Sequence, residues 1–112
     1  MIRIERHPLV SRDLRELARH VAEVSGDPRA AEHRLDQVDA LLADILLNPK
    51  SGTSLSAGLA GWRVRHGGTG RKITIVFRLT DPGDRLQIAL VAFSGQNWLG
   101  TVPDRSGAFP GG

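Results

Sequence analysis

Apolar side chains recur at helical spacing over two long stretches near the start of the chain. In residues 9–25 the intervals of four and three residues select Val10, Leu14, Leu17, Val21 and Val24. In residues 28–47 the same intervals select Ala31, Leu35, Val38, Leu42 and Ile45. Because each set lines one side of an α-helix, the pattern predicts two amphipathic helices, each with one face to bury.

Short signals at the helix boundaries indicate that the two helices form a hairpin. Gly26 is typical of the residue just after a helix, and Asp27 followed by Pro28 is typical of the start of the next one. Asn48-Pro49 ends the second helix. Because so few residues separate the helices, we expect an antiparallel pair that packs together on one face of a sheet.

Strand patterns surround this hairpin. Ile2 and Ile4 alternate with charged residues and predict a short first strand. Later strands are expected at residues 62–66, 72–80 and 86–93, separated by the turns Gly67-Gly68-Thr69-Gly70 and Asp81-Pro82-Gly83-Asp84. Such short turns make an antiparallel meander. The order β-α-α-β-β-β predicts an α+β domain with the helices on one face of a small sheet and the other face open; the position of the first strand is undecided.

The length of 112 residues favours one domain. We expect that domain over residues 1–100. After Trp98 the sequence becomes rich in Gly and Pro, so we expect residues 101–112 to be a mobile tail.

Charge is unevenly distributed along the chain. Residues 1–47 hold 7 Lys and Arg against 9 Asp and Glu, whereas residues 48–112 hold 8 against 3, so the two parts carry −2 and +5 and sum to +3. The basic half fits an acidic partner, either nucleic acid or an acidic protein segment, unless it is only a solvated surface. There is no Cys, no apolar run near the roughly 20 residues of a membrane span and no signal-peptide pattern. We therefore expect a cytoplasmic protein without a membrane partner.

Three arginines are the main candidates for a binding site. Because side chains alternate along a strand, Arg63 and Arg65 point away from Trp62, and Arg78 points away from the apolar side of its own strand. If the two strands pair, one open face carries all three guanidinium groups, a surface for phosphate or carboxylate. The alternative is an exposed face that arginine keeps soluble.

Other residues have clearer structural interpretations. Arg71 and Lys72 in the intervening turn would add charge at the rim of that face, but this turn lacks the spacing of a phosphate-binding loop. Trp62 is expected in the core under the helices, and Trp98 either covers the sheet edge or forms an exposed contact. The four histidines do not cluster, so we expect no metal site, and no motif indicates a cofactor.

Four ordered pieces of the sequence resemble a known family. They are Asp13-Leu14-Arg15-Glu16-Leu17, Ala30-Ala31 with Leu35, Leu46-Leu47-Asn48-Pro49-Lys50-Ser51-Gly52, and Gly61-Trp62-Arg63-Val64 leading into Ile73-Thr74-Ile75-Val76-Phe77-Arg78. In this order they resemble the RelE/ParE toxin superfamily of bacterial type II toxin–antitoxin systems, over about residues 1–96. The resemblance implies growth inhibition, as in plasmid stabilization, and a hetero-oligomer with a cognate antitoxin whose acidic C-terminal segment wraps the toxin.

The superfamily divides by mechanism, and the residues here favour the ParE-like branch. RelE-like toxins cleave mRNA on the ribosome with basic residues on the second and third strands, an Arg after the fourth, and a Tyr or His near the C-terminus. Arg63 and Arg65 match the second-strand positions, but Thr74 stands at the third-strand position and the chain has no Tyr. We therefore expect a ParE-like toxin that inhibits DNA gyrase by protein binding.

Two alternatives remain. One is an enzyme, a ribosome-dependent mRNA endoribonuclease in which His66 is the catalytic acid or base beside Arg63 and Arg65. The other is a non-toxic binding module with the same fold.

Overall fold

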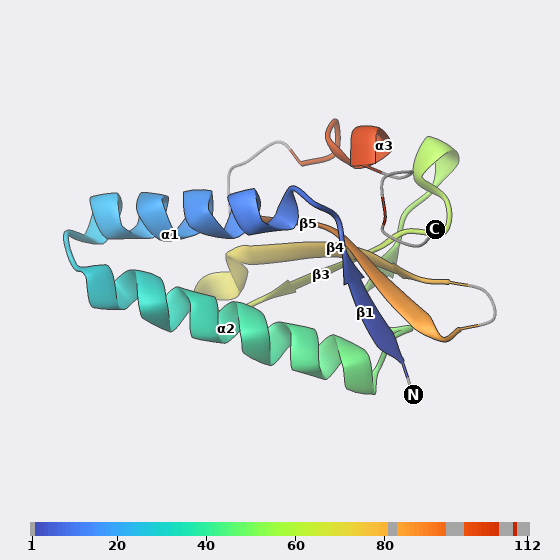
Figure 1. Cartoon of the computed structure of the whole chain (residues 1–112), viewed down its shortest axis with the longest axis horizontal. Helices are drawn as coiled ribbons and strands as arrows, with labels where there is room; N and C mark the ends of the chain where they lie inside the picture. Colours follow the sequence, from blue (N-terminus) through green and yellow to red (C-terminus); the bar gives the residue numbers. More distant parts are fainter. Residues whose placement is uncertain (1, 81–82, 94–97, 106–108, 110–112) are drawn as a thin grey trace.

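The structure, a computed structural model, describes residues 2–80, 83–93, 98–105 and 109. Its elements are β1 (Arg3–Arg6), α1 (Val10–Ser25), α2 (Pro28–Leu47), β2 (Thr53–Ser54), the 3₁₀ turn η1 (Ala57–Leu59), β3 (Arg63–Gly67), the 3₁₀ turn η2 (Thr69–Arg71), β4 (Ile73–Leu79), β5 (Arg85–Phe93) and α3 (Val102–Arg105) (Figure 1). The predicted order is confirmed, and β2, η1, η2 and α3 are additions to it.

The five strands form one sheet in the order β1-β5-β4-β3-β2. Neighbours from β2 to β5 are antiparallel, whereas β1 runs parallel to β5 with Ile4 opposite Leu86. This places the first strand, undecided from the sequence, at the sheet edge beside the last strand. The α+β class with a mainly antiparallel sheet is confirmed.

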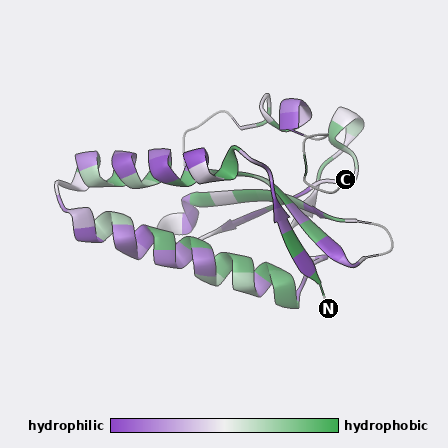
Figure 2. Ribbon diagram, viewed as in Figure 1, coloured by the Kyte–Doolittle hydropathy of each residue, from purple (hydrophilic) through white to green (hydrophobic). Residues whose placement is uncertain are grey.

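The helical hairpin covers one face of the sheet and forms the first core. Gly26 ends α1 in the left-handed conformation at φ 70°, and the Asp27 side chain accepts a hydrogen bond from Arg29 N at 3.0 Å to begin α2. Both helices turn their apolar stripes toward the sheet (Figure 2). The buried residues of this core are Val10, Leu17, Val21, Ala31, Val38, Leu41, Leu42, Ile45, Ile73, Ile75, Phe77, Leu86, Ile88 and Val91.

The opposite face of the sheet is covered as well, which corrects the expectation of an open face. A second core there consists of Trp62, Val64, Val76, Ala89, Leu90, Ala92, Val102 and Phe109. Trp62 therefore lies on the far side from the helices, and its expected position under them is wrong. Of residues 101–112, expected to be a mobile tail, Val102, Arg105 and Phe109 are buried against the sheet, while 106–108 and 110–112 lie outside the described residues.

A β-bulge in β5 shapes the junction between the two cores. Val76 is paired with Leu90 and Phe77 with Ile88, so Ala89 is an extra residue in β5. Ala89 and Leu90 both belong to the second core, whereas Ile88 and Val91 belong to the first. Two successive residues of β5, Ala89 and Leu90, thus contribute to the same core at the bulge, and the alternation between the two cores resumes at Val91.

Side chains satisfy the edge of β5 where β1 no longer pairs with it. The last backbone contact from that side is His7 N to Ile88 O at 2.9 Å. Beyond it, Val91 N donates to the Asp13 carboxylate at 3.1 Å, and Arg105 donates to Ala89 O at 3.0 Å. Arg105 also forms a two-pronged ion pair with Asp13, one prong of 2.9 Å, so α1, β5 and α3 are joined at one point.

We expect Asp13→Asn to lower the free energy of unfolding by about 3 kcal/mol, because it leaves the buried Arg105 charge without its partner. The matched control is Glu16→Gln, which removes an exposed helical ion pair with Arg12 and should change stability by less than about 1 kcal/mol. Urea unfolding of both variants measures the difference. Equal effects would contradict the central role of the Asp13–Arg105 pair.

Candidate partner-binding surface

The pairing of β3 with β4 decides where the candidate arginines point. Arg63 lies opposite Phe77, and Arg65 lies opposite Ile75. Directly paired residues share a sheet face, and Phe77 and Ile75 belong to the helix-side core. Arg63 and Arg65 therefore project on the helix side, whereas Arg78 lies on the other face. The predicted cluster of three arginines on one open face is wrong.

Arg65 fastens β3 to the end of α2. One guanidinium nitrogen donates to Ser51 Oγ at 2.7 Å, and the other forms an ion pair with Asp44. The side chain is largely covered. Arg65 thus has partners within the chain, and a charge reversal there would place a carboxylate beside Asp44.

Arg78 is part of the second face. Its guanidinium carbon lies 4.3 Å from the centre of the Trp62 ring and 5.8 Å from that of Phe109, and Nε donates to Gln87 Oε1 at 2.7 Å. Gln87 in turn donates to Glu5 at 2.9 Å. Burial lowers the pKa of Arg78, although a guanidinium of this kind keeps its charge at neutral pH. Its stacking on two aromatic rings gives it a structural role.

Arg63 differs from the other two because its half-buried side chain makes no hydrogen bond or ion pair with the described residues. Arg65, two residues further along the same face of β3, lines a depression of about 520 Å³, which we call the basic groove. It is lined by Leu47, Asn48, Pro49, Lys50, Ser51 and Arg65. Leu47 is 81% exposed, so this end of the molecule combines cations with an uncovered apolar side chain.

The candidate acid or base lies apart from these cations. His66 is exposed on the second face, and its Nδ1 lies 2.9 Å from Thr74 Oγ1. Because side chains alternate along β3, His66 points away from the sheet face that carries Arg63 and Arg65. The three residues proposed for RNA cleavage therefore do not converge.

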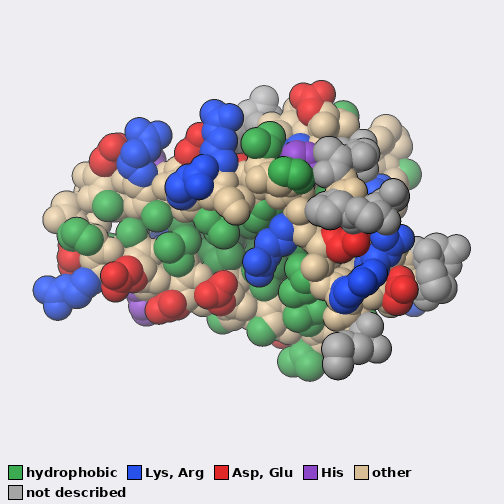
Figure 3. Space-filling view, in the orientation of Figure 1, with side chains coloured by type: hydrophobic (Ala, Val, Ile, Leu, Met, Phe, Trp, Pro, Cys, Tyr) green, Lys and Arg blue, Asp and Glu red, His purple; other side chains and the backbone are tan. Residues whose placement is uncertain are grey.

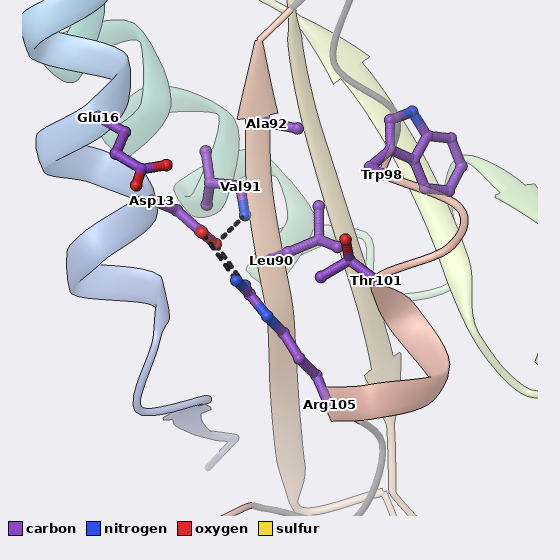
Figure 4. A pocket seen from close by; sticks show the side chains of 8 residues that line it. All are labelled: Asp13, Glu16, Leu90, Val91, Ala92, Trp98, Thr101 and Arg105. Carbon is purple, nitrogen blue, oxygen red and sulfur yellow. Dashed lines mark hydrogen bonds and ion pairs between the residues drawn. The ribbon is translucent and has the colours of Figure 1, made fainter.

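The remaining candidates lie elsewhere. Arg71 and Lys72 are exposed at η2. Trp98 is half-buried and packs against the second core. It also lines a small cleft of about 150 Å³ beside Asp13 and Arg105 (Figure 4). A contact role for Trp98 stays a prediction.

A buried polar cluster near the start of α1 was missed by sequence reasoning. His7 is buried, its Nδ1 accepts a hydrogen bond from Leu9 N at 3.1 Å, and its ring meets that of Phe109 edge-on at 5.7 Å. Burial lowers the pKa of His7, the Arg105 charge lowers it further, and Asp13 partly opposes them. No sequence signal links these residues, because Arg105 and Phe109 follow a stretch with the composition of a tail.

Two kinds of site are not found in the part of the chain that the structure describes. No group of three or more His, Asp or Glu side chains there could hold a metal ion. No helix among those residues is long and apolar enough to cross a membrane.

Residues 4–98 match the family model described as "ParE toxin of type II toxin-antitoxin system, parDE". The chain belongs to the ParE toxin family. It is thus a toxin-type protein of the RelE/ParE superfamily, as its sequence motifs indicated.

A solved structure gives independent support for the ParE-family fold. The toxin–antitoxin complex RelBE2 from Mycobacterium tuberculosis contains a chain that matches with a TM-score of 0.58 and 20% sequence identity. The match covers 82% of the ParE-family chain and 96% of the other. Comparison with curated protein sequences gave no match.

We expect the ParE-family chain to lose stability in mild acid because of His7. The folded-state pKa of His7 lies below its ordinary value of 6.5, so the unfolded state binds the proton first as the pH falls. The contribution of His7 to the free energy of unfolding is complete above pH 6.5 and is lost as the pH falls through the folded-state pKa.

The test is urea unfolding of the wild type, His7→Gln and His33→Gln at a series of pH values. The series runs from about pH 7.5 to about pH 5, where histidine titrates. The exposed His33 is the matched control. His7→Gln should flatten the pH dependence, while His33→Gln should keep it. If the free energy of unfolding of His7→Gln depended on pH as steeply as that of the wild type, His7 would not be the group responsible.

Proposed function

We propose that the chain is the toxin of a type II toxin–antitoxin pair that acts by binding DNA gyrase and is neutralised by the acidic C-terminal segment of a cognate antitoxin. The main support is the separation of His66 from Arg63 and Arg65 across the sheet. This separation favours protein binding over the RNA-cleaving alternative, whose proposed residues lie on opposite faces of the sheet.

The argument rests on what RNA cleavage requires. A 2′-hydroxyl must lose a proton, the phosphorane needs cations, and the leaving 5′-oxygen needs an acid, all around one phosphate. Every His, Lys and Arg of the chain lies in the described residues, and there is no Tyr. His66 is paired with Thr74, and the cations nearest to it along β3 point to the opposite face. Protein binding needs no such constellation.

The basic groove with Arg63 is the surface we assign to the antitoxin. An acidic segment could pair its carboxylates with Arg63 and Lys50 and cover Leu47 with an apolar side chain. Carboxylates are stronger partners for arginine than neutral acceptors. The structural neighbour RelBE2 was solved as a toxin–antitoxin complex, which favours a hetero-oligomer here as well.

Expression of the chain in a bacterium, followed by a gyrase supercoiling assay with purified protein, tests the proposal. We expect growth arrest and inhibited supercoiling, both retained in His66→Gln because the proposal gives His66 no catalytic role and its side chain lies outside the basic groove. Arrest with normal supercoiling, abolished by His66→Gln in a folded protein, would support the ribonuclease instead. Absence of arrest with folded protein present would leave a binding module without toxicity.

We expect Arg63→Glu to weaken binding of the cognate antitoxin by about tenfold or more, because charge reversal turns attraction into repulsion at the groove. Arg63 is chosen over Arg65 because Arg65 is bound by Asp44 and Ser51, so its replacement would also disturb contacts within the chain. Arg15→Glu is the matched control, an exposed arginine on α1 outside the groove. Isothermal titration calorimetry with both variants measures the change, and equal affinities would remove the assignment of this surface.

A further inference from the structure

A second hollow lies at the other end of α2 from the basic groove. Its volume is about 360 Å³, and its lining residues come from the end of α1, the first half of α2, the η2 region and the end of β5. We call it the hairpin pocket. It is lined by His20, Val21, Val24, Ser25, Ala30, His33, Arg34, Gln37, Thr69, Lys72 and Phe93. This size lies in the range of small-molecule sites, roughly 300–1,000 Å³.

The charge of the lining is one-sided. Two cations, Arg34 and Lys72, and two imidazoles, His20 and His33, line the pocket, and no carboxylate of the described residues does. Elsewhere α1 carries both acidic and basic side chains, whereas α2 carries mainly acidic ones (Figure 3), and residues 1–47 hold more acidic than basic groups. A pocket whose described lining holds cations and no carboxylate favours an anion.

The wall that carries Lys72 is held in place. Arg34 donates to Thr69 O at 3.2 Å and to Gln37 Oε1 at 2.8 Å, while Gln37 Nε2 donates to Thr69 Oγ1 at 2.8 Å. Gly68 fits beneath this clamp at φ 73°, where a Cβ atom would come within 2.8 Å of Gln37 Oε1. The glycine-rich turn thus serves as a fixed support beside the pocket, so a ligand would not need to order it.

The pocket also offers apolar surface. The Phe93 ring is flanked by the His20 ring at 5.4 Å between centroids and by the Arg34 guanidinium carbon at 5.4 Å. Val24, which also lines the pocket, is 76% exposed. An inorganic ion would leave these groups uncovered, whereas an apolar or aromatic body would bury them.

We propose that the hairpin pocket binds a small organic anion, a carboxylate or phosphate carried on an apolar or aromatic body. The anionic group faces Lys72 and the imidazoles, and the body lies against Val24 and Phe93. This site is independent of the proposed toxicity and of the basic groove, which shares none of its residues.

The test is a titration of the full chain with phenyl phosphate, followed by two-dimensional amide NMR. Shifts should concentrate at residues 20–37, 69–72 and 93. Lys72→Glu should weaken binding by about tenfold, because it removes one attractive charge and adds a repulsive one. Lys50→Glu is the matched control, an exposed lysine in the basic groove, and should leave the affinity unchanged.

Three results would overturn the proposal. They are shifts absent from the pocket at millimolar phenyl phosphate, equal loss of affinity in Lys72→Glu and Lys50→Glu, and equally tight binding of neutral benzyl alcohol. Inorganic phosphate should bind more weakly than phenyl phosphate, and equal affinity would refute the apolar part of the site. None of these readouts depends on growth arrest or on gyrase, so failure here leaves the proposed function untouched.

Discussion

The packing of this molecule depends on how the backbone N–H and C=O groups at the edge of β5 find hydrogen-bond partners. β1 pairs with β5 only as far as Ile88, and a backbone group left unpaired in the interior would be costly. Asp13 and Arg105 meet that requirement from opposite sides, one accepting from Val91 N and the other donating to Ala89 O. Their mutual ion pair ties the first helix to the last, so the helix layer, the sheet and the C-terminal cover share one polar junction.

The fold was largely predictable because its strongest signals are local. Each helix carries its own stripe and boundary residues, and the observed bounds agree with the expected ones within one residue. The meander follows from short turns. The local sequence does not tell which face of β3 meets the helices, because the apolar side chains of Trp62 and Val64 could pack on either side of the sheet. Its true partners, Val102 and Phe109, belong to a stretch whose Gly and Pro content resembles a tail.

The candidate site shows the same division between residue type and placement. Arginine on β3 and β4 was recognised from the sequence, yet Arg65 and Arg78 are engaged by Asp44 and by Trp62 within the chain. Arg63 alone of the three makes no polar contact with the described residues. Side-chain type gives the chemistry that a surface can offer, but pairing register decides which charges remain for a partner.

The position of Phe109 after all five strands in sequence has a consequence for synthesis on the ribosome. Translation completes the helical hairpin and the whole sheet before it delivers Val102, Arg105 and Phe109, which close the second core. Until those residues are in place, Trp62 and Val76 lack the cover that Val102 and Phe109 give, and the edge of β5 lacks the Arg105 guanidinium that joins it to α1. A chain that stopped before Val102 would therefore keep the helix-side core but leave apolar side chains of the opposite sheet face more exposed, a state that favours aggregation.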